Sequence, residues 1–175
     1  MSFNPALLNP LRSSSFNAFF MSMRNAYTAP GLSIHFYVVE WDSTALPWAK
    51  FRGELLGPTD PAAAPANSIR GTIMSDWQKL GLSAEPNTGM NGVHASASPF
   101  EGMAERMNWL QTPARTDAFA RELLDAGLSE ATLKAWSVDP RVKVDGEMTS
   151  IFDALEDLDA GPCLDALKAI NAENC

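Results

Sequence analysis

A histidine in a short turn of small residues has the clearest capacity for chemistry in this chain. His94 lies in the run 91–96, and Glu105 follows eleven residues later (94 to 105), on a predicted helix. A neutral imidazole can attack phosphorus if an acceptor holds its other ring nitrogen and fixes the tautomer. The spacing therefore suits a nucleophilic His94 that Glu105 orients, although a single histidine in a loop is more often a surface or core residue without a chemical role.

Four further side chains offer groups that can bind a phosphate, whose negative charge spreads over several oxygens during transfer. Arg70 carries a forked cation that can hold a phosphate through two hydrogen bonds. Thr59 supplies a hydroxyl, Asn91 supplies an amide, and Ser96 bears on the carboxylate of Glu105 or on a phosphate. Arg70 can equally close the fold as an ion-pair partner, so both interpretations of this residue stay open.

These residues occur in a fixed order along the chain. The order resembles the second half of the nucleoside diphosphate kinase family, which reads G-x-T-x-P-A, then I-R-G, then N-x-x-H-G-S, then a helix with a glutamate. The matching segments are Gly57–Ala62, Ile69–Gly71, Asn91–Ser96 and Glu105. The resemblance implies a protein that passes a phosphate from one nucleotide to another through a phosphohistidine at His94.

The resemblance also implies a set of site residues and partners. Three residues would carry the catalysis: His94, Glu105 and Ser96. Five would contact the nucleotide: Phe19, Thr59, Arg70, Asn91 and Lys143. Mg²⁺ would come with ATP rather than from a protein cage. The expected partners are nucleoside di- and triphosphates, together with further copies of the chain or a larger complex.

The chain departs from the family pattern at several places. Gly53 stands where the family has an arginine, and Arg52 lies one step away, on another helical face. Ala97 replaces the acid that follows shortly after the family's histidine, and no Lys-Pro-Asp-Gly strand precedes the matched segments. A second function therefore stays open, in which the chain is a catalytically degenerate, kinase-derived structural subunit of a larger assembly.

The missing first strand has a candidate nearer the C-terminus. Val142–Gly146 resembles the family's first-strand motif, with Val144 in place of proline, and Gly161–Lys168 loosely resembles the start of the second strand. One interpretation is a circular permutant, in which Val142 and Val144 pair beside the core strands and Lys143 projects toward His94. The other interpretation is an unrelated acidic helical tail.

The predicted elements make an α+β fold. Ser33–Trp41 alternates bulky, β-prone residues and predicts a buried strand. Ser98 begins a helix with Pro99 at its first position and Glu101 in a capping box. Other helices are predicted at 47–56 and from Thr116, Ser129 and Ser150, the last ending at Gly161. The resemblance implies a ferredoxin-like antiparallel sheet with covering helices, divided into a core (1–112), a helical linker or appendage (113–140) and the permuted strand and helix or tail (141–175).

The composition limits the classes of partner. The 175 residues carry a formal net charge of −8, and the 13 lysines and arginines are scattered, which argues against a nucleic-acid surface. No apolar run is long enough to predict a transmembrane segment. Cys163 and Cys175 form no metal or disulfide framework, so the cytoplasm is the expected compartment. The absence of acidic residues before Glu40 keeps an organelle, mitochondrion or plastid, as the alternative.

Overall fold

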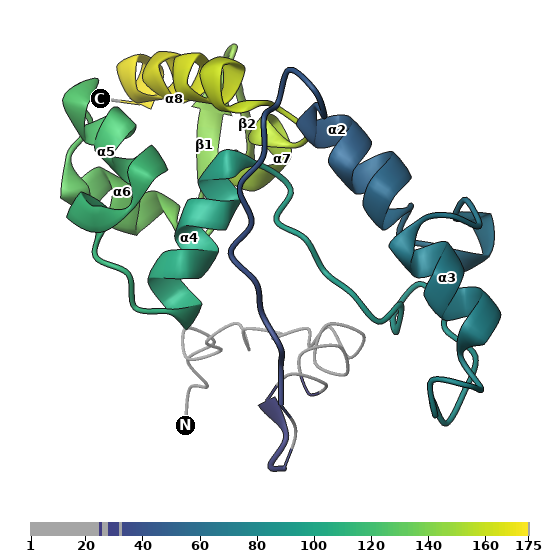
Figure 1. Ribbon diagram of the computed structural model, residues 1–175. Coiled ribbons are helices and arrows are strands. Elements are labelled where there is room, and N and C mark those ends of the chain that lie inside the picture. Colours follow the sequence, from purple (N-terminus) through teal and green to yellow (C-terminus); the bar gives the residue numbers. More distant parts are fainter. Residues whose placement is uncertain (1–24, 26–27, 32, 175) are drawn as a thin grey trace, which may run out of the picture. The chain divides into compact units, whose positions relative to one another are not determined.

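The computed structural model describes residues 25, 28–31 and 33–174 (Figure 1). The chain divides into two units, Met1–Val38 and Val39–Cys175. The predicted strand Ser33–Trp41 is wrong, because these residues form no strand, and the apolar side chains from Ile34 (44% exposed) to Val39 (57% exposed) are not buried. Strand propensity measures how well residues suit a pleated surface, but a strand forms only where a neighbour accepts its backbone hydrogen bonds.

The second unit is built from short helices and a two-stranded sheet (Figure 1). In chain order its elements are α2 (Trp48–Lys50), η2 (Phe51–Leu56), η3 (Pro61–Ala63), α3 (Ile69–Asp76), α4 (Pro99–Trp109), η4 (Ala114–Thr116), α5 (Ala118–Asp125), α6 (Glu130–Trp136), β1 (Arg141–Val144), β2 (Glu147–Ser150), α7 (Ile151–Leu155) and α8 (Ala160–Asn174). Here η2 is π-helical, whereas η3 and η4 are 3₁₀ helices. Within the described residues, none of the helices combines the length and the apolar character that crossing a membrane requires.

The predicted helix at 47–56 is confirmed, since α2 continues directly into η2. Gly57 ends it with a φ of 93°, a conformation that glycine adopts at little cost. The loop that follows packs tightly against α3. A Cβ on Gly71, in the first turn of α3, would lie 2.0 Å from the carbonyl oxygen of Pro65, so only glycine fits this close approach of two backbones.

Polar side chains cap most of the later helices, as local sequence chemistry requires. Ser98, Ser129 and Ser150 each accept a hydrogen bond from an amide in the first turn of α4, α6 and α7, so these three predicted helix starts are confirmed. The start predicted at Thr116 is wrong by one residue. Thr116 ends η4, and it is Asp117 whose carboxylate accepts the hydrogen bond that caps α5.

β1 and β2 form an antiparallel hairpin in which Val142 faces Thr149 and Val144 faces Glu147. The predicted pairing of Val142 and Val144 with core strands is therefore wrong. Two residues with positive φ, Asp145 (51°) and Gly146 (86°), connect the strands, as the tightest hairpin turns require. The predictions for Gly161 are wrong as well, because this residue neither ends α7 nor starts a strand but lies in the first turn of α8.

One hydrophobic core joins α4 to the helices and the hairpin that follow it. Its buried members are Phe100, Met103, Ala114, Phe119, Ala120, Leu123, Leu128, Leu133, Trp136, Val142, Ile151, Leu155, Cys163, Leu167 and Ile170. Residues 141–174 pack against α4 and the helices that follow it, because β1, α7 and α8 all contribute to this core. The predicted general class, α+β, is confirmed too.

Candidate functional site

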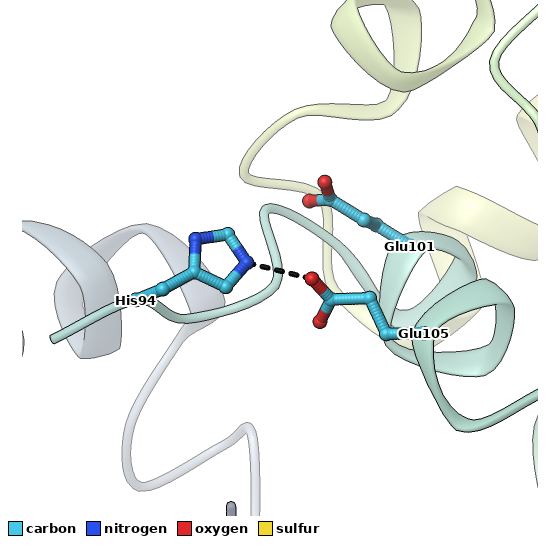
Figure 2. A group of neighbouring side chains, drawn as sticks. All are labelled: His94, Glu101 and Glu105. Carbon is cyan, nitrogen blue, oxygen red and sulfur yellow. Dashed lines mark hydrogen bonds and ion pairs between the residues drawn. The ribbon is translucent and has the colours of Figure 1, made fainter. Parts of the chain in front are cut away.

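The first turns of α4 place two carboxylates beside His94. The Ser98 hydroxyl accepts a hydrogen bond from the Glu101 amide at 3.2 Å, and the Glu101 carboxylate reaches back to accept from the Ala97 amide. The predicted capping box is thus modified, because Glu101 accepts from the amide one residue before the N-cap, which holds its side chain against the turn that precedes the helix. Glu105 follows four residues later, on the same face of α4, so both side chains extend toward His94 (Figure 2).

His94, Glu105 and Ser96 are in direct contact. His94 Nε2 lies 2.7 Å from Glu105 Oε1, and Ser96 Oγ donates a hydrogen bond to Glu105 Oε2 at 2.5 Å. The ring edge that carries Nε2 faces Glu105, whereas Nδ1 points away from it (Figure 2). The His94 side chain is 55% exposed. The structure therefore brings together the three residues that the sequence predicts to carry catalysis.

The titratable groups of this cluster influence one another. The hydrogen bond to Glu105 raises the pKa of His94 against the opposing effect of burial. Burial raises the pKa of Glu101, and the charge of Glu105 raises it further. Burial alone would also raise the pKa of Glu105, but the hydrogen bonds from His94 and Ser96 hold it below its ordinary value. A neutral His94 therefore carries its proton on Nε2, toward the ionised Glu105, and its lone pair on Nδ1.

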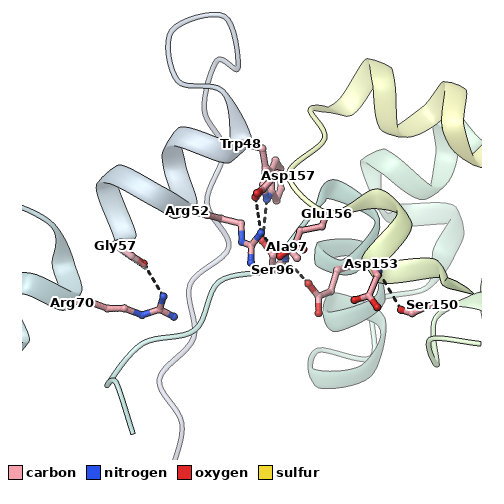
Figure 3. Close-up of polar contacts among 11 residues, drawn as sticks. Trp48, Arg52, Gly57, Arg70, Ser96, Ala97, Ser150, Asp153, Glu156 and Asp157 are labelled. Carbon is pink, nitrogen blue, oxygen red and sulfur yellow. Dashed lines mark hydrogen bonds and ion pairs between the residues drawn. The ribbon is translucent and has the colours of Figure 1, made fainter. Parts of the chain in front are cut away.

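Two distant residues hold the backbone of the His94 turn through its carbonyl groups. Trp48 Nε1 donates to the Ser96 carbonyl at 3.0 Å, and the Asp157 amide donates to the Ala97 carbonyl at 2.9 Å. Figure 3 shows Trp48, from α2, and Asp157, from the connection between α7 and α8, near this turn. Sequence reasoning missed them, because no local pattern signals a contact between residues so far apart.

Arg52 strengthens the same junction. Its Nη1 lies 2.9 Å from Glu156 Oε1 and 2.5 Å from Asp157 Oδ1, in the connection between α7 and α8 (Figure 3). The sequence indicates only that Arg52 lies one step from the position of the family's arginine. The structure gives it a different task, which is to tie η2 to the segment that supports the Ala97 carbonyl.

Arg70 is buried and bonds to backbone carbonyls. It is 8% exposed, its Nη1 donates to the Gly57 carbonyl at 2.7 Å, and its Nη2 donates to the Val93 carbonyl at 2.9 Å. The guanidinium therefore links Gly57 at the end of η2 (Figure 3) to Val93, the residue before His94. Its charge lowers the pKa of His94, so it acts on the site electrostatically.

The remaining predicted site residues lie in different places. Asn91 Nδ2 donates to the Thr59 carbonyl at 3.1 Å, so these two residues are brought together. Lys143 lies on β1, where its Nζ is 3.8 Å from Glu173 Oε1 and its amide donates to Asn174 Oδ1. The structure thus joins Lys143 to the end of α8 rather than to His94. Phe19 lies outside the described residues.

The cluster also has the spacing of metal ligands. One ligand atom from each of His94, Glu101 and Glu105 lies within 4.8 Å of the other two. Mg²⁺ prefers an octahedron of oxygen atoms, and the imidazole nitrogen makes this set a poor match to it. The Mg²⁺ that the resemblance implies would therefore be held by the phosphates of the nucleotide.

The chemistry of the site follows from its geometry. The Glu105 carboxylate contacts His94 at Nε2 and accepts a hydrogen bond from the Ser96 hydroxyl, so the lone pair of the neutral ring is on Nδ1. Such a set can attack an electrophile at Nδ1, hold a proton at Nε2 or bind a cation between its carboxylates. Comparison of the chain with protein-family models, with curated proteins and with solved structures found no match.

Proposed function

We propose that the protein accepts a phosphoryl group on His94 and passes it to a nucleotide, in the manner of a nucleoside diphosphate kinase. The observation that carries this proposal is the 2.7 Å contact between His94 Nε2 and Glu105 Oε1, supported by the hydrogen bond from Ser96. A carboxylate at Nε2 favours the tautomer whose lone pair is on Nδ1. It also stabilises the positive charge that develops on the ring during attack.

The transfer has two balanced halves. In the first, the Nδ1 lone pair attacks the terminal phosphorus of a nucleoside triphosphate, and the nucleoside diphosphate leaves with the electron pair of the broken phosphorus–oxygen bond. The Nε2 proton stays in its hydrogen bond to Glu105. In the second, a terminal oxygen of another nucleoside diphosphate attacks that phosphorus, and Nδ1 regains its electron pair. When bound with the nucleotide, Mg²⁺ neutralises part of the phosphate charge.

Residues on the two loops beside His94 are the proposed contacts to the nucleotide. Asn91 and Thr59 lie side by side, which supports a joint role at the sugar or phosphates. Arg70 contributes its charge from below the surface, since its two terminal nitrogens hold backbone carbonyls. Phe19 keeps the nucleotide-binding role that the resemblance implies, as an expectation.

A second function, a structural subunit derived from a kinase, has observations of its own in support. Arg70 serves the fold through backbone carbonyls, and the apolar side chains between Ile34 and Val39 are exposed in an extended segment. The ferredoxin-like sheet of the family needs more strands than β1 and β2. A second copy of the chain or a larger complex would supply neighbours for such a sheet and cover the exposed segment.

Labelling with γ-labelled ATP tests the first function, and the chain offers a matched control variant for it. It contains two histidines, His35 and His94. Full-length protein incubated with the nucleotide and Mg²⁺ should carry a phosphate that is labile in acid and stable in alkali. The label should persist in His35→Ala and disappear in His94→Ala. Added nucleoside diphosphate should then release it as nucleoside triphosphate.

The opposite outcomes are equally definite. Label that survives in His94→Ala, for example on a serine, would contradict a phosphohistidine at this position. A folded wild-type protein that takes up no label would favour the structural subunit. In that case, light scattering of the purified protein and of its native complex should show an assembly larger than one chain.

A further inference from the structure

We infer that His94, Glu101 and Glu105 form a binding site for a divalent transition-metal cation, with Zn²⁺ as the best match. The inference rests on the geometry of these three side chains and does not require phosphoryl transfer. Their ligand atoms lie within 4.8 Å of one another. One imidazole nitrogen and two carboxylate oxygens are ligands that Zn²⁺ accepts readily, whereas Mg²⁺ and Ca²⁺ prefer oxygen ligands.

The spacing needs only small side-chain movements to close around an ion. Zn²⁺ binds nitrogen and oxygen at about 2.0–2.2 Å, which sets neighbouring ligand atoms roughly 3.4 Å apart in a tetrahedron. His94 Nε2 and Glu105 Oε1 are 2.7 Å apart, so these two atoms need to separate only slightly to admit the ion. Glu101 and Glu105 are separated by one turn of α4, and two ligands at this helical spacing are a common basis of zinc sites.

Both carboxylates are oriented by donors outside the set of ligands. Ser96 Oγ bonds to Glu105 Oε2, and the Ala97 amide bonds to Glu101 Oε2. Each donor occupies one oxygen of its carboxylate, so the other oxygen can turn to the cation. Supporting hydrogen bonds of this kind fix ligand geometry in metal sites.

Charge and access also favour a cation. Two partly buried carboxylates share a single imidazole, so their mutual repulsion is relieved when a divalent ion lies between them. The exposed side of His94 provides an entry path. Three protein ligands leave one tetrahedral position for water or for an anionic ligand, which is the arrangement of zinc sites that remain open to solvent or substrate.

Metal binding and phosphoryl acceptance would be alternative states of His94. A cation on Nε2 displaces the proton from this nitrogen, and a neutral imidazole then carries its proton on Nδ1. The Nδ1 lone pair is no longer available to attack phosphorus in that state. Zn²⁺ would therefore regulate the proposed phosphoryl transfer at the same residue.

Calorimetric titration of metal-free, full-length protein with Zn²⁺ tests the site. We expect one Zn²⁺ per chain, unchanged affinity in Glu122→Gln and an affinity at least about tenfold weaker in Glu101→Gln. Glu122 is an exposed glutamate of α5, so its replacement matches the charge change. A glutamine at 101 can still accept from the Ala97 amide, which protects the helix start. Thermal melts establish that both variants are folded.

Co²⁺ binding to the wild-type protein gives a second measurement, which does not depend on the folding of any variant. We expect the visible absorption of tetrahedral Co²⁺ without a thiolate charge-transfer band. Absence of Zn²⁺ binding, equal affinity in wild type and Glu101→Gln, or a thiolate band would each overturn the inference. If the protein binds Zn²⁺ but takes no label from ATP, the metal site stands and the proposed phosphoryl transfer is refuted. If it takes label from ATP but binds no Zn²⁺, the phosphoryl transfer stands and the metal site is refuted.

Discussion

Replacing Arg106 with alanine should destabilise the protein through Asp117, its buried partner. Arg106 lies on α4, and its guanidinium donates to Asp117 through Nε at 2.6 Å and through Nη2 at 3.1 Å. The Asp117 side chain is 2% exposed, and it also caps α5 by accepting from the Ala120 amide at 3.0 Å. The substitution therefore leaves a buried carboxylate with backbone donors alone and without its cation.

The expected loss follows from this burial. Removing one partner of a buried ion pair costs about 3–5 kcal/mol of unfolding free energy, because the other charge stays uncompensated. The Arg106 side chain is 29% exposed, so solvent screens part of the interaction. The Ala120 amide also keeps its bond to Asp117. We therefore expect about 3 kcal/mol, which is a large part of the roughly 10 kcal/mol typical of a whole domain.

Equilibrium unfolding in urea, followed by tryptophan fluorescence and circular dichroism, measures this loss. Arg121→Ala is the control, because Arg121 is exposed on α5 and its removal should cost less than about 0.5 kcal/mol. Adding Asp117→Asn to Arg106→Ala should restore part of the stability, since asparagine can cap α5 without a buried charge. A loss below about 1 kcal/mol, or no recovery in the double variant, would refute the reasoning.

The loss should also depend on pH with a definite sign. Burial alone would raise the pKa of Asp117, but the Arg106 hydrogen bonds hold it below its ordinary value of 3.8. A depressed carboxyl pKa contributes its full stability above the unfolded-state value, and this contribution is lost as the pH falls through the folded-state value. The difference in unfolding free energy between wild type and Arg106→Ala should therefore stay constant from neutral pH to about pH 5 and become smaller under more acidic conditions.

Three further outcomes are expected. Truncation after Pro140 should leave an unfolded or insoluble fragment, because β1, α7 and α8 supply buried core side chains, and a cooperative melt close to that of the full chain would contradict this. Gly71→Ala should destabilise by about 1–3 kcal/mol in urea unfolding, whereas Gly161→Ala, with no atom within 4 Å of the new methyl, should not. Glu105→Gln should lower the pKa of His94 in an NMR titration, and an unchanged pKa would show that the pair does not form in solution.

Local chemistry explains the parts of the fold that the sequence predicted correctly. The caps at Ser98, Ser129 and Ser150 depend on a hydroxyl and an amide three residues away, so a short window of sequence contains all of the information. The hairpin turn at Asp145–Gly146 is equally local, since Asp-Gly favours the positive φ values of a two-residue turn. The resemblance to the family's first-strand motif instead predicted a single strand at Val142–Gly146, because it was given more weight than the Asp-Gly turn signal.

Pairing and burial at long range could not be predicted in the same way. Ser33–Trp41 has the composition of a buried strand, but composition does not specify whether a neighbouring strand exists. At the site, the spacing of His94 and Glu105 was sufficient because a helix start fixes their relative positions. The contribution of Trp48 to the same turn left no sequence signal, because its partner is a backbone carbonyl, which every residue has.

The contacts that hold the His94 turn determine when a newly synthesised chain can acquire its site. The Trp48 amide bonds to Asp159 across 111 residues, and Arg52 bonds to Asp157 across 105. Contacts of such high sequence separation require the closure of long loops and form slowly. On the ribosome, the turn lacks the bond from the Asp157 amide until that residue has emerged, although His94 and Glu105 emerge earlier. Completion of these contacts is therefore a late event in folding, and a chain interrupted before Asp157 carries His94 and Glu105 without the full set of bonds that holds their turn.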